Sequence, residues 1–140
     1  MIQGSRIFSV PAADAGRAAE HFKSKLELET DPSDLYHDMQ AKVPGFMILD
    51  GRRLAAYELG HIPGAINIYH ADINAATTAQ FSKTDMFVCY CTGVGCNASS
   101  KAALNLAALG FFVKELIGGL HEWDAHGYPI AIGKEPGQLP

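Results

Sequence analysis

Short apolar runs alternate with helical patterns along most of the chain. The continuous apolar runs at 46–49 and 86–90 are typical of strands that are covered on both faces of a parallel sheet. Further strands are predicted at 26–30, 65–68 and 111–117, and helices at 11–25, 31–40, 53–59, 76–81 and 99–109, with a short helix around Trp123. Because strands alternate with helices, the pattern predicts an α/β fold with a central parallel sheet of about five strands and helices on both faces.

The length and composition fit one globular domain. The chain has 140 residues, of which 48% are hydrophobic and 19% are charged. No linker or internal repeat divides it. We expect residues 1–140 to form a single domain, with 46–130 as its core and 1–40 as an N-terminal helical extension packed on that core.

The charge balance and the hydropathy pattern argue against two classes of partner. A net charge of −4 offers no basic field for nucleic acid, and no apolar run is long enough to span a membrane. The N-terminus lacks a secretion pattern. Three cysteines are few for a disulfide scaffold, and an odd number leaves one of them unpaired. We therefore expect a cytoplasmic protein with no nucleic-acid or membrane partner. One acidic run is interpreted as a solvated face: Glu27, Glu29, Asp31, Asp34 and Asp38.

The segment with the strongest chemical signal is the loop that begins at Cys91. This cysteine follows the strand at 86–90 and precedes the helix at 99–109, the place where open α/β sheets bind ligands. Glycines let the loop fold tightly, so that several N–H groups converge, and the helix dipole adds positive potential there. Lys101 is the single charged side chain between 86 and 113, so no sequence-local carboxylate is expected to oppose a Cys91 thiolate.

Cys91 is therefore the candidate nucleophile, and the loop that follows it is the candidate binding site. The backbone N–H groups of 93–97 would hold an anionic sulfur as an oxyanion hole holds oxygen. The predicted substrate-binding residues are Thr92, Gly93, Val94, Gly95, Cys96 and Asn97.

Three blocks of sequence, in order, resemble rhodanese-like sulfurtransferases. Residues 50–52 with 60–67 are similar to the N-terminal signature of that family, 90–93 to its active-site loop, and 117–120 with Trp123 to its closing signature. The resemblance covers residues 46–130. It implies a three-layer α/β/α fold around a parallel five-stranded sheet, and a cysteine that carries one sulfur atom as a persulfide. Cys91 matches that cysteine by position.

The loop departs from the common family pattern in two respects. It is slightly longer before the helix, which bears on the size of the pocket. It also lacks the arginine or lysine often present, which bears on the anionic donor that is accepted. In their place the loop carries a second thiol, Cys96.

The function that the resemblance implies is sulfur transfer. The Cys91 thiolate would take a sulfane sulfur from a small donor, thiosulfate or a persulfide, and pass it to a thiol, to cyanide or to a protein acceptor. No metal or organic cofactor is expected. Asp50, Arg52 and His61 are interpreted as supporting residues, with Asp50 and Arg52 free to pair with each other and His61 holding a turn.

Two alternative functions stay open. A reversible Cys91–Cys96 disulfide would make the domain a redox sensor or a persulfide carrier without turnover. Cysteine-dependent phosphatases and arsenate reductases use a similar loop, but Asn97 stands where they have an arginine clamp.

Two other motifs are interpreted as decoys. The segment 93–98 matches a dinucleotide fingerprint, with Glu115 at the expected distance, but too few residues follow for that fold. His121 and His126 are five residues apart, which does not place them on one face of a zinc-binding helix.

Overall fold

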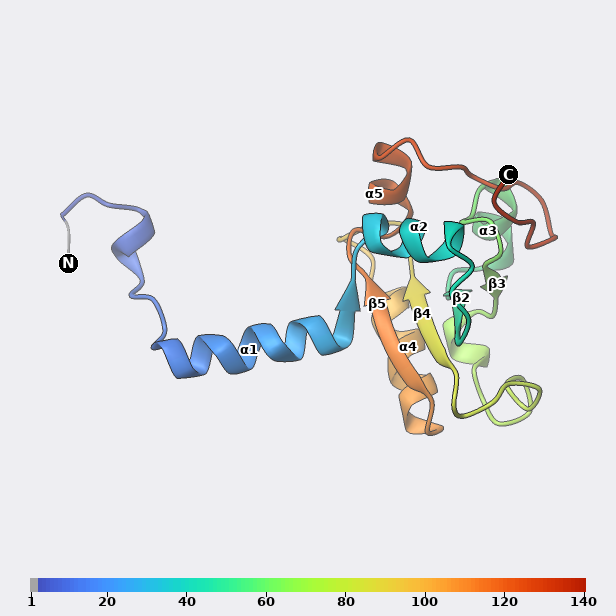
Figure 1. Cartoon of the computed structure of the whole chain (residues 1–140), viewed down its shortest axis with the longest axis horizontal. Coiled ribbons are helices and arrows are strands. Elements are labelled where there is room, and N and C mark those ends of the chain that lie inside the picture. Colours follow the sequence, from blue (N-terminus) through green and yellow to red (C-terminus); the bar gives the residue numbers. More distant parts are fainter. Residues whose placement is uncertain (1–2) are drawn as a thin grey trace.

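Five parallel strands form the central sheet of the computed structural model, which describes residues 3–140 (Figure 1). The strands are β1 (Glu29–Thr30), β2 (Phe46–Asp50), β3 (Ile66–Asn67), β4 (Met86–Tyr90) and β5 (Phe112–Leu116). Their spatial order is β1-β5-β4-β2-β3, and every pairing is parallel. The predicted fold class, an α/β fold with about five parallel strands, is confirmed.

The sheet is covered on both faces, which makes three layers. The α-helices are α1 (Ala15–Leu28), α2 (Pro32–Gln40), α3 (Leu54–Leu59), α4 (Ala98–Ala108) and α5 (Gly119–Ala125), and two 3-10 turns lie at Ile7–Ser9 and His70–Asp72. α4 packs on one face, and α2, α3 and α5 contribute buried side chains to the other. No helix within residues 3–140 has the length and apolar character needed to cross a membrane.

β4 shows why its run of apolar residues predicts a strand buried on both sides. Phe87 and Cys89 join the cluster that α4 covers, whereas Val88 and Tyr90 join the cluster with Trp123 of α5. Successive side chains of a strand point to opposite faces, so both sets must be apolar. Because the strands are parallel, β2, β4 and β5 also end at one edge of the sheet, where the cysteine loop begins.

The N-terminal extension differs from the expectation that residues 1–40 pack on the core. β1 joins the sheet and α2 buries Leu35, but α1 extends away from the domain and buries none of its residues (Figure 1). Its face is built largely of alanines, which bury little apolar area, and its larger apolar side chains stay exposed, Phe22 at 58% and Leu26 at 74%. Residues 1 and 2 lie outside the described part of the chain.

Two predicted elements are wrong for local reasons. Residues 26–28, predicted as strand, complete α1, because leucine and glutamate favour helix and Lys25 pairs with Glu29 one turn later (2.6 Å). The helix predicted at 76–81 is a series of turns. Asn74 Oδ1 accepts from the Thr77 N–H and the Thr77 hydroxyl donates to a backbone carbonyl, and such bonds compete with helix formation.

Candidate active site

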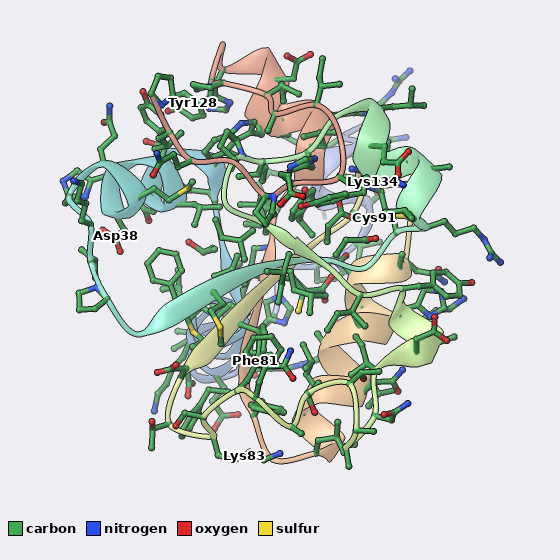
Figure 2. The ribbon with its side chains drawn as sticks, turned by 90° about the vertical axis from the view of Figure 1, so that its right-hand side faces the viewer. Asp38, Phe81, Lys83, Cys91, Tyr128 and Lys134 are labelled. Atoms are coloured by element: carbon green, nitrogen blue, oxygen red, sulfur yellow. A yellow bond between two sulfur atoms is a disulfide. The ribbon has the colours of Figure 1, made fainter. Side chains whose placement is uncertain are left out.

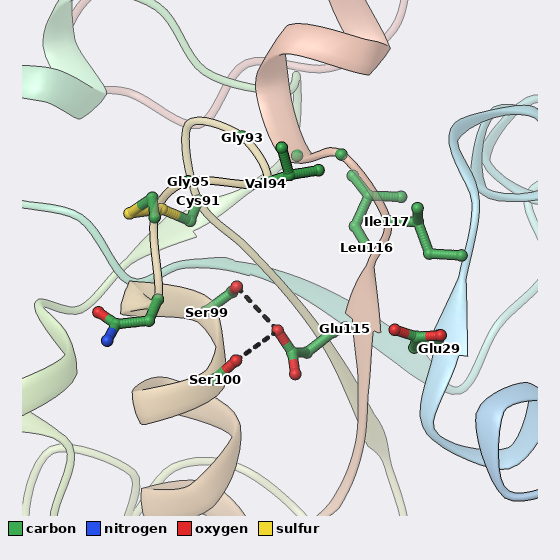
Figure 3. A pocket seen from close by; sticks show the side chains of 14 residues that line it. Glu29, Cys91, Gly93, Val94, Gly95, Ser99, Ser100, Glu115, Leu116 and Ile117 are labelled. Atoms are coloured by element: carbon green, nitrogen blue, oxygen red, sulfur yellow. Dashed lines mark hydrogen bonds between the residues drawn. A yellow bond between two sulfur atoms is a disulfide. The ribbon is translucent and has the colours of Figure 1, made fainter. Parts of the chain in front are cut away.

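Cys91 lies at the carboxyl end of β4, beside the start of α4 (Figure 2). Its loop and the end of β5 enclose a pocket of about 660 Å³ (Figure 3). Cys91 is 2% exposed in this disulfide form, and it is one of the residues that line the pocket. The pocket is lined by Glu29, Cys91, Gly93, Val94, Gly95, Cys96, Asn97, Ser99, Ser100, Glu115, Leu116, Ile117, Gly118 and Gly119.

Cys91 and Cys96 are joined by a disulfide across the loop (Figure 3). Their Cα atoms are 6.3 Å apart, within the range that a disulfide spans without backbone movement. In this form neither sulfur is a nucleophile. Reduction yields two thiols that are separated by the four residues of the loop between them. Sequence reasoning named both cysteines and left their pairing open.

One backbone amide of the loop forms a hydrogen bond within the loop itself. The N–H of Cys96 donates to the carbonyl of Gly93 (3.1 Å), so the expectation that this N–H holds substrate sulfur is wrong for the disulfide form. Within the described residues no acceptor is found for the N–H groups of Gly93, Val94, Gly95 or Asn97. These four amides stay available to an anion that enters the pocket.

The first turn of α5 holds the other side of the loop. The N–H groups of Leu120 and His121 donate to the carbonyls of Cys91 and Thr92, both at 2.9 Å. Gly119 has φ +57°, and a Cβ there would overlap the Cys91 carbonyl oxygen, so this close approach requires glycine. Five of the six predicted binding residues, 93–97, line the pocket. Thr92 does not, and its carbonyl is instead tied to α5.

Two carboxylates that sequence reasoning did not assign to the site lie in the pocket wall. The hydroxyls of Ser99 and Ser100, in the first turn of α4, both donate to Glu115 Oε2 at 2.9 Å (Figure 3). Glu29 is the strand neighbour of Glu115, and it pairs with Lys25. Glu29 is thus not simply part of a solvated face.

In the described part of the chain, Glu115 is the unpaired carboxylate of the pocket wall, because Glu29 is paired with Lys25. No lysine, arginine or histidine within the described residues lines the pocket, and Glu115 has no cationic partner there. A signal for Glu115 does exist in the sequence: it is a charged residue in a mostly apolar strand, one position before that strand reaches the active edge.

Cys89, the third cysteine, lies inside β4 and is fully buried. Burial, together with the negative charge of Glu115, raises the pKa of its thiol to about 12. Cys89 is therefore a core residue, as the sequence predicts for a cysteine within a strand.

Asp50 and Arg52 form a buried ion pair behind the loop. Arg52 Nη2 lies 2.6 Å from Asp50 Oδ2, and it also donates to the carbonyl of Gly60 (2.7 Å). Burial lowers the pKa of the Arg52 guanidinium, but hydrogen bonding and charge attraction from Asp50 outweigh it and raise the pKa above its ordinary value. Neither residue lines the pocket. Their role is structural, because the bond from Arg52 to the Gly60 carbonyl joins the end of β2 to the segment after α3.

His61 also lies away from the pocket. Its ring is fully buried and stacks on Tyr57 with ring centroids 3.7 Å apart. Nδ1 lies 2.9 Å from the Tyr57 carbonyl oxygen, and Nε2 lies 3.1 Å from the carbonyl oxygen of Pro136. The imidazole thereby ties the C-terminal segment to α3.

Comparison with known proteins finds a family match and close structural similarity. A family model described as a rhodanese-like domain matches residues 31–126. The crystal structure of the BH2092 protein from Bacillus halodurans has 40% sequence identity and a TM-score of 0.82, over 86% of this chain and 88% of that one. The thiosulfate sulfurtransferase from Pseudomonas aeruginosa has 27% identity and a TM-score of 0.63, over 78% of this chain but 20% of that one.

A curated relative contains a similar stretch within a longer protein. The HTH-type transcriptional regulator Rv0324 from Mycobacterium tuberculosis is 36% identical over 90 residues, which are 64% of this chain and 39% of the regulator. The chain therefore matches well under half of the length of that regulator.

Proposed function

The chain belongs to the rhodanese-like domain family, and from that premise we propose that it is a sulfurtransferase which carries sulfane sulfur on Cys91. The observation that carries the proposal is the position of Cys91. It lies at the carboxyl end of a central parallel strand and lines a pocket, next to a loop in which four amide N–H groups have no acceptor among the described residues. Among the described residues, Cys96, its disulfide partner, is the other cysteine that lines the pocket, and Cys89 does not.

The proposed reaction begins with reduction of the Cys91–Cys96 disulfide by thiols, which a reducing compartment such as the cytoplasm supplies. The Cys91 thiolate then attacks the outer sulfur of the donor, and the sulfur–sulfur bond of the donor breaks. The donor remnant leaves as an anion, and Cys91 is left with a persulfide. The free N–H groups of 93–95 and Asn97 stabilise the negative charge on sulfur.

A direct test traps the sulfur on Cys91. Reduced Cys96→Ser protein is freed of reductant, incubated with glutathione persulfide and digested for peptide mass spectrometry. The expected result is one added sulfur atom on the peptide that contains Cys91, and conversion of added cyanide to thiocyanate with loss of that sulfur. Absence of added sulfur on Cys91, in a protein that is folded and reduced, would contradict the proposal.

The unpaired Glu115 carboxylate in the pocket wall bears on the class of donor. Thiosulfate carries two negative charges, and Glu115 repels them without a cation in the pocket wall to compensate. We therefore propose that persulfides, with a single charge near the reacting sulfur, are better donors, and that thiosulfate is usable but has a high KM. The similarity to a thiosulfate sulfurtransferase supports the reaction class rather than this donor.

Glu115→Gln is expected to lower the KM for thiosulfate about fivefold, equivalent to roughly 1 kcal/mol for one half-exposed charge. The KM for the persulfide of 2-mercaptoethanol should change by less than about twofold. Glu20→Gln makes the same change of net charge on α1, away from the pocket, and should leave both values unaltered.

The effect of the Glu115 charge can be measured independently by alkylation of Cys91 in the reduced Cys96→Ser variant. Iodoacetate and iodoacetamide are alike in size and differ in charge, so the ratio of their rates reports the potential at the sulfur. Glu115→Gln should raise the iodoacetate-to-iodoacetamide ratio several-fold. An unchanged ratio would show that the Glu115 charge does not determine which donor is preferred.

A second candidate function is a redox or persulfide sensor, and the Cys91–Cys96 disulfide favours it. The similarity to part of a transcriptional regulator supports the same idea. The two candidates differ in turnover: a sensor changes state once per oxidant, whereas an enzyme forms many equivalents of thiocyanate per protein. Measurement of thiocyanate against protein concentration separates them.

A further inference from the structure

The loop holds two cysteines at bonding distance in a pocket where sulfur transfer needs one. Cys91 is 2% exposed, whereas Cys96 lies in the same pocket wall and is partly exposed. In a Cys91 persulfide the inner sulfur is this buried Sγ, so we expect an external thiol to reach it less readily than the outer sulfur. Cys96 needs no access path, because its sulfur is bonded to Cys91 Sγ in the structure.

We propose that Cys96 is a resolving thiol, which releases the transferred sulfur as hydrosulfide and makes the protein a persulfide reductase. This inference rests on the proposed function, since it begins from the Cys91 persulfide. It adds a second reaction outcome, sulfide release, to transfer onto an external acceptor. The natural product of that step is the Cys91–Cys96 disulfide that the structure contains.

The chemistry balances in three steps. The Cys91 thiolate attacks the outer sulfur of a persulfide R–S–SH, which forms Cys91–S–SH and releases R–S⁻. The Cys96 thiolate then attacks Cys91 Sγ, the bond from Sγ to the outer sulfur breaks, and HS⁻ leaves as the disulfide forms. The outer sulfur gains two electrons and the two cysteines lose two. A dithiol reductant restores both thiols and becomes a disulfide itself.

The surroundings of the loop favour this second step. The two Cα atoms are 6.3 Å apart, so ring closure needs no large movement of the backbone. The N-terminal end of α4 and the free loop amides stabilise the Cys96 thiolate as well as that of Cys91. The leaving group is an anion, and among residues 3–140 no cationic side chain lines the pocket to retain it.

The test is a single turnover without external reductant. Wild-type protein is reduced, freed of reductant under anaerobic conditions and mixed with one equivalent of glutathione persulfide. We expect one equivalent of sulfide, loss of two thiols, and a Cys91–Cys96 disulfide in the peptide map. Cys96→Ser should keep the sulfur on Cys91 and release sulfide at least about a hundredfold more slowly.

Cys89→Ala is the matched control, because it also removes one cysteine but lies in the core and not in the pocket. It should release sulfide as the wild type does. Equal sulfide release from Cys96→Ser and wild type, or a stable Cys91 persulfide in the wild type, would overturn the inference. Failure of Cys96→Ser to take up sulfur at all would instead contradict the proposed sulfurtransferase function.

Discussion

Cys91→Ser is expected to abolish sulfur transfer, with a loss of at least about a thousandfold in kcat/KM for thiocyanate formation. Loss of a catalytic nucleophile has effects of this size or larger, because serine oxygen is not activated here and cannot carry a persulfide. The measurement uses fully reduced proteins, so that loss of the disulfide does not contribute. The far-UV circular dichroism spectra of the reduced proteins should agree between variant and wild type, since the change replaces one small side chain at the end of β4. The buried serine hydroxyl should lower the free energy of unfolding by no more than about 1–3 kcal/mol, which leaves the variant folded in the assay.

Cys96→Ser serves as the control for removal of a loop thiol. In the presence of cyanide it should still form thiocyanate, because its Cys91 persulfide is intact. The assignment of the nucleophile would be reversed if Cys96→Ser lost thiocyanate formation and Cys91→Ser kept it.

Arg52→Ala is expected to lower the free energy of unfolding by about 3–5 kcal/mol. The variant leaves the fully buried Asp50 carboxylate without its cation, and it removes the hydrogen bond to the Gly60 carbonyl. Total stability of a domain is about 5–15 kcal/mol, so the loss is a large share of it. Urea unfolding followed by tryptophan fluorescence measures the change, because Trp123 is buried in the core.

Its neighbour provides the matched control. Arg53 is exposed and lies over the Tyr69 ring, 4.4 Å from its centroid, so Arg53→Ala should cost less than about 1 kcal/mol. The double variant Asp50→Asn/Arg52→Met removes both buried charges and should be less destabilised than Arg52→Ala. Equal losses from Arg52→Ala and Arg53→Ala would show that the buried pair contributes little.

The sequence predicts the features that depend on local pattern. The apolar runs that become β2 and β4 identify strands covered on both sides, and the break of the second run at Cys91 places the loop at the active edge. The match to the rhodanese-like family agrees with the blocks around residues 50–67, 90–93 and 117–123. The close approach of Gly119 to the Cys91 carbonyl explains physically why one of those blocks contains glycine.

The features that sequence reasoning missed depend on which strands are neighbours. Glu115 and Glu29 meet in the pocket because β1 and β5 pair in parallel register, and no local pattern contains that pairing. The position of α1 likewise depends on a balance between weak apolar burial and helix propensity. The turns at 76–81 arise from side-chain hydrogen bonds that a hydropathy pattern does not record.

The buried position of Cys89 within β4 allows unfolding of the sheet to be measured by alkylation of its thiol. Because its thiol is buried and its pKa is raised to about 12, an alkylating reagent reaches it only in molecules whose core has opened. When opening and closing are fast, the labelling rate relative to that of a free cysteine gives the population of open molecules. At alkaline pH the unfolded thiol loses its proton at a lower pH than the native one. The native state then binds more protons, and stability falls as the pH rises. A side chain with no part in sulfur transfer thus reports the free energy of the fold that positions Cys91.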